Sequence, residues 1–177
     1  FYPVINGERY LPPNDTVYDW QPVFTAEGII DEVVQSVIDH FQAYPQRQSC
    51  SLGINDSHRY DDVLFQGSAG TNFLGFPNLS NSYYNFCNRV AYQVLLAGVD
   101  KYFGCLAYSH VAAPPIGFQL HPRIVPFMTY DRMKWCNPEI RAQGQQITLA
   151  WNAAADRIGW YDYLYGAAYC IPRVYPH

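Results

Sequence analysis

The chain has 177 residues, of which 49% are hydrophobic and 15% charged, a balance typical of one globular domain with a real core. Its net charge is -4, and its 11 Lys and Arg are scattered, so no basic patch indicates nucleic acid or an anionic membrane as a partner. No apolar run approaches the ~18 residues of a membrane span. These properties exclude nucleic-acid-binding and membrane-spanning classes.

Tyrosine and cysteine usage gives a first indication of the site. The 16 Tyr supply most of the 17% aromatic content, and Tyr combines a flat apolar ring with a polar tip. Such rings suit sugar-binding clefts, but they also suit protein interfaces and ordinary cores. The five Cys show no CxxC or Cys/His metal spacing, so we interpret them as small buried hydrophobes and expect no metal or other cofactor.

The first half of the chain predicts a helix, a strand, a long loop and a second helix. Apolar residues recur every three or four positions over residues 27–44, and Pro45 ends this predicted helix. The run SCSLGIND at 49–56 is too brief for a helix and predicts a strand. Residues 57–80 are rich in Gly, Ser and Asn and predict a loop of unusual length. The second helix is predicted over 81–97.

The second half of the chain predicts two strands, a helix and a last strand. The strands are predicted at 102–110 and 124–131, joined by an irregular Pro-containing stretch. Pro138 fits the first turn of a helix that extends to about residue 155. The last strand is predicted at 157–162, and 163–177 predict a loop. Apolar runs separated mainly by helices favour an α/β fold with a parallel sheet.

A polar residue follows each predicted strand. These residues are Asp56, His110, Asp131 and Asp162. The carboxyl ends of parallel strands lie at one edge of a sheet, where βα loops build active sites in barrels and in open α/β sheets. The pattern therefore predicts a site at this edge.

Three of these four residues are carboxylates, which are candidate catalytic groups. A carboxylate beyond a buried strand is costly unless it is hydrogen-bonded or solvated in a cleft. Glycoside hydrolysis needs two such groups, one acid and one base or nucleophile, about 5 to 9.5 Å apart. Asp is also a common helix cap and turn residue, and Asp131 taken alone is better explained by that role.

The stretch SHRYDD follows the first predicted strand directly. His58 and Arg59 are candidates for holding a ligand hydroxyl or carboxylate, since Arg suits bidentate recognition. The alternative is a solvated loop in which Asp61 and Asp62 simply pair with Arg59.

Further candidate substrate-binding residues follow the later strands. Tyr108 and His110 offer a proton donor and an imidazole, although a lone His in such a place is more often structural. The stretch WYDYLYG supplies Trp160, Tyr163 and Tyr165 as a stacking wall for a sugar ring, or as packing at the end of a barrel. No GxGxxG, Walker, HExxH or GxSxG motif points to another chemistry.

Several long segments resemble a known family. These are YPVINGERY, QPVFTAEGIIDEVVQSVIDHFQAYPQRQSCSLGINDS, YYNFCNRVAYQV, LAYSHVAAPP and WYDYLYGAAYCIPRVYP. They resemble a large bacterial family of domains of unknown function with a glycosidase-like TIM barrel, distantly similar to α-glucuronidases and to β-N-acetylhexosaminidase-type barrels. The resemblance covers the chain from about Phe1 to Pro176, and its most specific parts are SLGINDS and YDYLYG.

The resemblance implies a (β/α)₈ barrel, a carbohydrate-active role and an acid at Asp56. Hexosaminidase-type barrels carry an Asp-Glu pair at that strand end, whereas Ser57 follows Asp56 here, so a substrate-assisted mechanism is not supported. A whole barrel takes ~250 residues, and only four strands are predicted. We therefore expect a partial barrel that is one segment of a longer chain, with the remainder of that chain as its partner.

The expected function is that of a glycoside hydrolase acting on a poly- or oligosaccharide. Asp56 is the favoured carboxylate, with Asp162 or Asp131 as its partner. Two alternatives stay open. One is a non-catalytic carbohydrate-binding barrel, and the other is a structural fragment whose Tyr residues contact the rest of its own chain.

Overall fold

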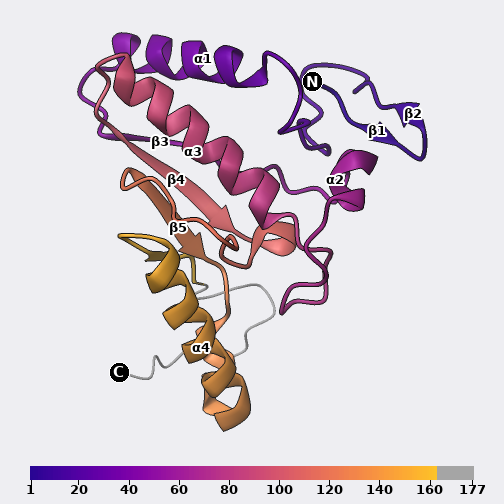
Figure 1. Cartoon of the computed structure of the whole chain (residues 1–177), viewed down its shortest axis with the longest axis vertical. Helices are drawn as coiled ribbons and strands as arrows, with labels where there is room; N and C mark the ends of the chain where they lie inside the picture. Colours follow the sequence, from indigo (N-terminus) through magenta and orange to yellow (C-terminus); the bar gives the residue numbers. More distant parts are fainter. Residues whose placement is uncertain (163–177) are drawn as a thin grey trace.

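The computed structural model of the chain describes residues 1–162 (Figure 1). About half of these residues form helices and strands, and the main feature is a four-stranded sheet. The elements in chain order are β1 (Val4–Ile5), β2 (Glu8–Arg9), α1 (Ile29–Ala43), β3 (Ser49–Ser51), α2 (Asp62–Gln66), α3 (Ser80–Leu96), β4 (Tyr102–Ala107), η1 (Ser109–Val111), β5 (Ile124–Met128), η2 (Arg132–Cys136), α4 (Pro138–Ala154) and β6 (Gly159–Trp160).

The sheet has the strand order β3-β4-β5-β6, and every pair in it is parallel. Each strand therefore lies beside the strand that precedes it in the sequence. The predicted α/β class, with a parallel sheet and helices in this order, is confirmed. The sheet of residues 1–162 is open, with β3 and β6 at its edges, so the described part of the chain shows no closed barrel.

Local sequence explains where the main helices begin and end. Gly28 adopts a positive φ of 79° directly before α1, and Pro45 follows the helix after Tyr44. The side chain of Asn137 accepts hydrogen bonds from the first backbone N–H groups of α4, and Pro138 occupies its first turn. The predicted bounds of α1, α3 and α4 are each correct to within two residues.

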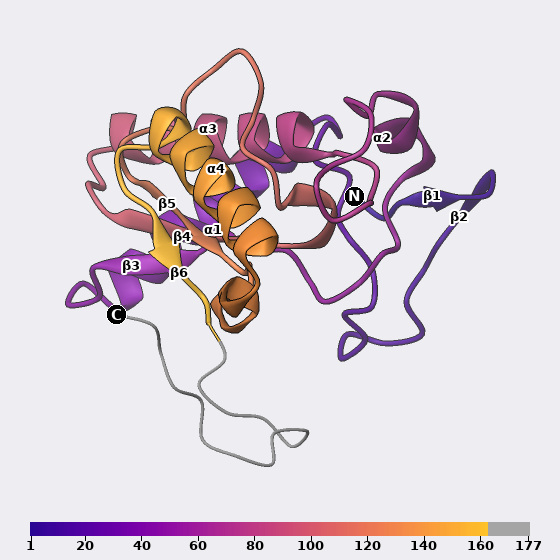
Figure 2. The ribbon, with the colours of Figure 1, turned by 90° about the horizontal axis from the view of Figure 1, so that it is seen from below.

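One face of the sheet is covered by helices. Residues that alternate along β4 and β5 are buried there, and the sulfur of Cys105 lies 3.8 Å from that of Cys87 on α3. Trp151 of α4 is 0% exposed, and its Nε1 donates to the carbonyl oxygen of Ala112. Figure 2 shows α3 and α4 together on this side of the sheet. The core of the described chain therefore lies between the helices and one sheet face.

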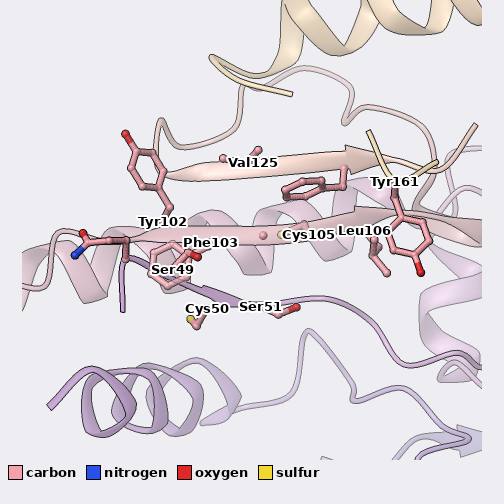
Figure 3. Close-up of a pocket in the computed structure, with 12 residues that line it drawn as sticks. Ser49, Cys50, Ser51, Tyr102, Phe103, Cys105, Leu106, Val125 and Tyr161 are labelled. Atoms are coloured by element: carbon pink, nitrogen blue, oxygen red, sulfur yellow. The ribbon is translucent and has the colours of Figure 1, made fainter. Parts of the chain in front are cut away.

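The opposite face of the sheet has no helix over it among the described residues. The alternate side chains of β4 and β5 point there and stay partly exposed, among them Leu106, Val125 and Phe127. They border a groove of about 570 Å³ along the strands, shown in Figure 3. Parallel sheets are normally covered on both faces. This face is therefore the unusual feature of the fold.

Phe127 lies on the open face between two glycines of the neighbouring strands. A Cβ placed on Gly159 of β6 would lie 2.5 Å from the Phe127 ring, and one on Gly104 of β4 would lie 3.5 Å from it. Strand β6 can approach β5 at this point because residue 159 has no side chain.

The N-terminal residues form a feature that the sequence did not predict. Strands β1 and β2 make a hairpin whose turn residues Asn6 and Gly7 both have positive φ. The Asp62 carboxylate accepts hydrogen bonds from the backbone N–H groups of both, and the Asp61 carboxylate accepts from Val4. Asp61 also caps the short helix α2, which lies inside the predicted loop. The hairpin is therefore fixed to the middle of the chain.

The cysteines of the described residues are free thiols in varied environments. Cys87 and Cys105 are buried as expected, Cys50 is half-buried, and Cys136 is exposed, contrary to the prediction. Within residues 1–162 no helix has the length and apolar character required to cross a lipid bilayer.

Candidate functional site

A pocket lies at the carboxyl edge of the sheet and draws residues from all four strand ends. Its volume is about 220 Å³. It is lined by Ile54, Asn55, Asp56, Leu106, Tyr108, Thr129 and Tyr161. We call it the strand-end pocket. The pocket lies at the edge where the sequence predicted a site, and it contains two of the predicted site residues, Asp56 and Tyr108.

Asp56 occupies the tip of a tight turn. Strand β3 ends at Ser51, so Asp56 lies five residues farther along rather than directly after the strand. The backbone N–H of Ser57 donates to the carbonyl oxygen of Asn55 at 2.9 Å, which closes a three-residue turn with Asp56 at its centre. The Asp56 side chain is exposed, and no hydrogen bond to it occurs within residues 1–162.

Two tyrosines supply the flat surfaces of the pocket. Tyr108 follows β4 and is 38% exposed, and Tyr161 follows β6 and is 49% exposed. Tyr161 and Leu106 line both the strand-end pocket and the groove on the open face. Figure 3 shows these two residues together at the carboxyl end of that groove, with Tyr102 at its other end. Pocket and groove are therefore neighbours on one surface.

Tyr161 and Thr129 are pocket residues that the sequence interpretation did not select. Tyr161 stands inside the stretch WYDYLYG, where Trp160 and later tyrosines were preferred. The pleat of β6 could have identified it, since neighbouring residues of a strand point to opposite faces. Thr129 Oγ1 donates to the carbonyl oxygen of Ala107 at 2.9 Å and thereby joins the ends of β4 and β5.

Asp162 is engaged in an ion pair and does not line the pocket. Its Oδ2 lies 2.7 Å from Nε of Arg132, and its side chain is only 7% exposed. The guanidinium of Arg132 also lies over the ring of Trp160, 4.7 Å from its centre. The predicted residues Asp162 and Trp160 therefore join one cluster with Arg132.

The other predicted residues lie elsewhere. Asp131 is half-buried and does not line the strand-end pocket. Arg59 forms an ion pair with Asp19 at 2.7 Å, so the expectation that it pairs with Asp61 and Asp62 is wrong, because those carboxylates hold the N-terminal hairpin. Tyr163 and Tyr165 lie outside the described residues.

With the geometry established, the comparisons with known proteins can be stated. The sequence matches the family model of a domain of unknown function, DUF4838, over residues 1–176. The chain belongs to the DUF4838 family. No curated protein and no solved structure matches it.

The DUF4838 chain carries a second polar cluster beside the pocket, built by His58, Ser109 and His110. Ser109 follows Tyr108 directly, is 3% exposed and has a positive φ of 52°, which is rare for a residue with a side chain. Its Oγ lies 3.1 Å from Nδ1 of His110 and 3.4 Å from Nδ1 of His58. The cluster thus joins the segment that carries Asp56 to the end of β4.

His110 is enclosed by aromatic rings rather than pointing into the pocket. The rings of Tyr60 and Phe76 lie 4.8 and 5.0 Å from it, and the side chain is 4% exposed. Burial, and secondarily the charge of His58, lower the pKa of His110 to about 4. His110 is therefore neutral at pH 7, and it is not among the described residues that line the strand-end pocket.

The chemistry available in the strand-end pocket of this DUF4838 domain is hydrogen-bond acceptance and ring packing. Its lining contains one carboxylate and no Lys, Arg or His among the described residues. Nowhere in residues 1–162 do three or more His, Cys, Asp or Glu side chains come together as a metal site. The arrangement suits an uncharged ligand rich in hydroxyl groups.

Proposed function

We propose that the strand-end pocket binds a neutral carbohydrate. The observation that carries the proposal is that the exposed Asp56 carboxylate lines one pocket together with the partly exposed rings of Tyr108 and Tyr161. A carboxylate accepts hydrogen bonds from sugar hydroxyls, and tyrosine rings pack against the apolar face of a sugar ring. The pocket lies below the range of about 300 to 1,000 Å³ typical of drug-sized ligands, which favours a single sugar unit.

Charge selects the class of sugar. Within residues 1–162 the lining supplies no cation to compensate a uronic acid or a phosphate, and the Asp56 carboxylate would repel either. A neutral sugar unit avoids this repulsion. The proposal therefore departs from a glucuronic acid substrate, which the distant resemblance to α-glucuronidases would favour.

Hydrolysis of a glycosidic bond is the second candidate function. It requires a second carboxyl group across the scissile bond from Asp56. Asp162 follows directly after Tyr161 of the pocket, which favours it as that group, but its ion pair with Arg132 has to open before it can contact a substrate. Binding without turnover is therefore the leading proposal.

The test is a binding and turnover assay with neutral oligosaccharides of the cellulose, xylan and starch types. We expect the wild type to bind such a sugar. The affinity of Asp56→Asn should be about tenfold or more lower, because a charge-assisted hydrogen bond contributes about 1.5 to 3 kcal/mol. Asp15→Asn is a matched control, since Asp15 is exposed and lies outside the pocket lining. Unchanged affinity in Asp56→Asn would contradict the proposal. Turnover that is abolished in both Asp56→Asn and Asp162→Asn would establish the hydrolase.

The open sheet face supports a proposal about the fold. We propose that the described sheet is part of a (β/α)₈ barrel closed by further strands of a longer polypeptide. Strand order follows chain order, and the connecting helices α3 and α4 lie on one face, as in a barrel wall. In a closed barrel the open face, with Leu106, Val125 and Phe127, becomes the interior.

A lysine on the open face tests this closure. Val125→Lys is expected to change the free energy of unfolding of the 177-residue chain by about 0.5 kcal/mol or less, and to destabilise a longer polypeptide strongly, because the charge is then buried. Leu149→Lys, on the 68% exposed side chain of α4, should be neutral in both. Equal, small effects of Val125→Lys in both proteins would contradict closure.

A further inference from the structure

We infer that Gln21 is a positioning residue that sets the orientation of Asp56, an inference that rests on the proposed sugar-binding function. Gln21 lies 34 residues before Asn55 in the chain and is 0% exposed, which is unusual for glutamine. Its Nε2 donates to the carbonyl oxygens of Asn55 at 2.6 Å and Ser57 at 2.9 Å. Its Oε1 accepts from the backbone N–H of Asn55 at 3.1 Å.

These three bonds hold the backbone on both sides of Asp56. The turn itself contributes the bond between Ser57 N–H and the Asn55 carbonyl, and its residues belong to no strand or helix of the described chain. Because a side-chain amide has both donors and an acceptor, one glutamine can satisfy all three backbone groups at once. Asp56 is thereby carried on a turn whose two flanking residues are fixed.

Neighbouring contacts fix Gln21 in turn. Its backbone N–H donates to the carbonyl oxygen of Arg59 at 2.9 Å. Asn55 Nδ2 donates to the carbonyl oxygen of Trp20, and Ser57 Oγ donates to that of Asp19, both at 2.6 Å. The segments 19–21 and 55–59 therefore clamp each other from both sides of the turn.

Gln21 acts through Asp56 rather than on the ligand. It is not among the described residues that line the strand-end pocket, where Asn55 and Asp56 are. A change of its side chain should therefore alter affinity only by releasing the turn. This distinguishes it from Asp56, whose carboxylate is proposed to contact the sugar.

The variant Gln21→Glu gives a test that depends on protonation. An ionised Glu is acceptor-only and would face the two carbonyl oxygens that Gln21 Nε2 now contacts, whereas a protonated Glu regains a donor and keeps an acceptor. Burial raises the pKa of a carboxyl group, so protonation falls within an accessible range of pH. Low pH should therefore restore the turn in this variant.

The experiment measures the affinity of wild type, Gln21→Glu and Gln35→Glu for the neutral oligosaccharide that the wild type binds, at pH 7 and pH 5. Gln35 is the control because it is exposed on α1 and its side chain bonds to Asp39 of the same helix, away from the turn. We expect Gln21→Glu to bind about tenfold more weakly than wild type at pH 7, with the ratio shrinking at pH 5. Gln35→Glu should have the same affinity as wild type at both pH values.

Amide hydrogen exchange of Ser57 gives a second readout that needs no ligand. Its N–H should be protected in wild type and Gln35→Glu and exchange rapidly in Gln21→Glu at pH 7. If the sugar-binding proposal fails, this comparison still decides the inference. If Asp56→Asn loses affinity while Gln21→Glu keeps both affinity and protection, the inference is overturned and the function stands.

A variant without charge covers the case in which Gln21→Glu does not fold. Gln21→Met keeps the length of the side chain and removes all three hydrogen bonds. We expect the same loss of Ser57 protection and of affinity, without recovery at pH 5. Wild-type affinity and protection in Gln21→Met would overturn the inference.

Discussion

The two faces of the sheet are made by the same strands and yet have opposite environments. On β5, Met128 is 1% exposed beneath the helices, while its neighbour Phe127 is 37% exposed on the open face. Each apolar group on the buried face stabilises the fold because it is fully removed from water. A group that lines the groove is removed from water only in part and stabilises the fold less. The difference teaches that hydrophobic character alone does not show which side of a strand forms the core.

The test with the largest expected effect replaces Met128 and Phe127 by alanine in two separate variants. We expect Met128→Ala to lower the free energy of unfolding by about 2 to 5 kcal/mol, because it leaves a cavity under the helices. Phe127→Ala should cost about 1 to 2 kcal/mol, since water can enter the groove and no enclosed cavity forms. Urea unfolding of both variants measures the difference. Equal losses would show that the open face is as important to the isolated chain as the covered one.

A change of pH gives a second test of the comparison between the two sheet faces. His110 is buried beside the covered core, so its protonation affects the stability of that side. In the folded chain the pKa of His110 is about 4, whereas its ordinary value is 6.5. Protonation therefore favours the unfolded chain, so the stability due to neutral His110 is complete above pH 6.5 and is lost as the pH falls toward 4.

The effect of pH on His110 can be isolated with a variant. We expect wild type to lose about 1 to 3 kcal/mol more than His110→Gln between pH 7 and pH 4, because the variant has no imidazole to protonate. Urea unfolding at several pH values measures both curves. Parallel curves would mean that His110 titrates normally in the folded chain.

The smallest expected effect concerns the contact of Phe127 with its glycine neighbours. Gly159→Ala should destabilise the chain by about 1 kcal/mol, because the new methyl group meets the Phe127 ring and forces it to move into the groove. Gly104→Ala should cost less, since its Cβ would meet the ring at an ordinary contact distance of 3.5 Å. Thermal unfolding of the two variants gives the ranking, and the reverse order would refute this account of the open face.

Periodicity predicted the long helices of the fold well, because each has an apolar face, and the strands β4 and β5 are short apolar runs. It could not predict which sheet face is covered, since both faces of β4 and β5 carry apolar residues. It also missed the N-terminal hairpin, whose strands have two residues each and are held by Asp61 and Asp62 from far along the chain. Contacts between distant segments leave no periodic signal.

The site could be predicted as a place but not as a set of contacts. The rule that parallel strands end at one edge predicted that Asp56 and Tyr108 lie near each other, and both line one pocket. The same rule could not show that Asp162 pairs with Arg132, because an ion pair depends on where a neighbouring segment returns. Gln21 gave no signal in the sequence, since its role arises from a turn 34 residues away.

The order of the strands also bears on how the protein is made. Since β3, β4, β5 and β6 lie side by side in the order in which they occur in the chain, each strand after β3 emerges from the ribosome with a partner already present. Pairing each strand with the next one in the chain gives smaller sequence separations than any other strand order would, and smaller separations favour faster folding. The sheet can therefore grow one strand at a time during synthesis, with β6 at its advancing edge.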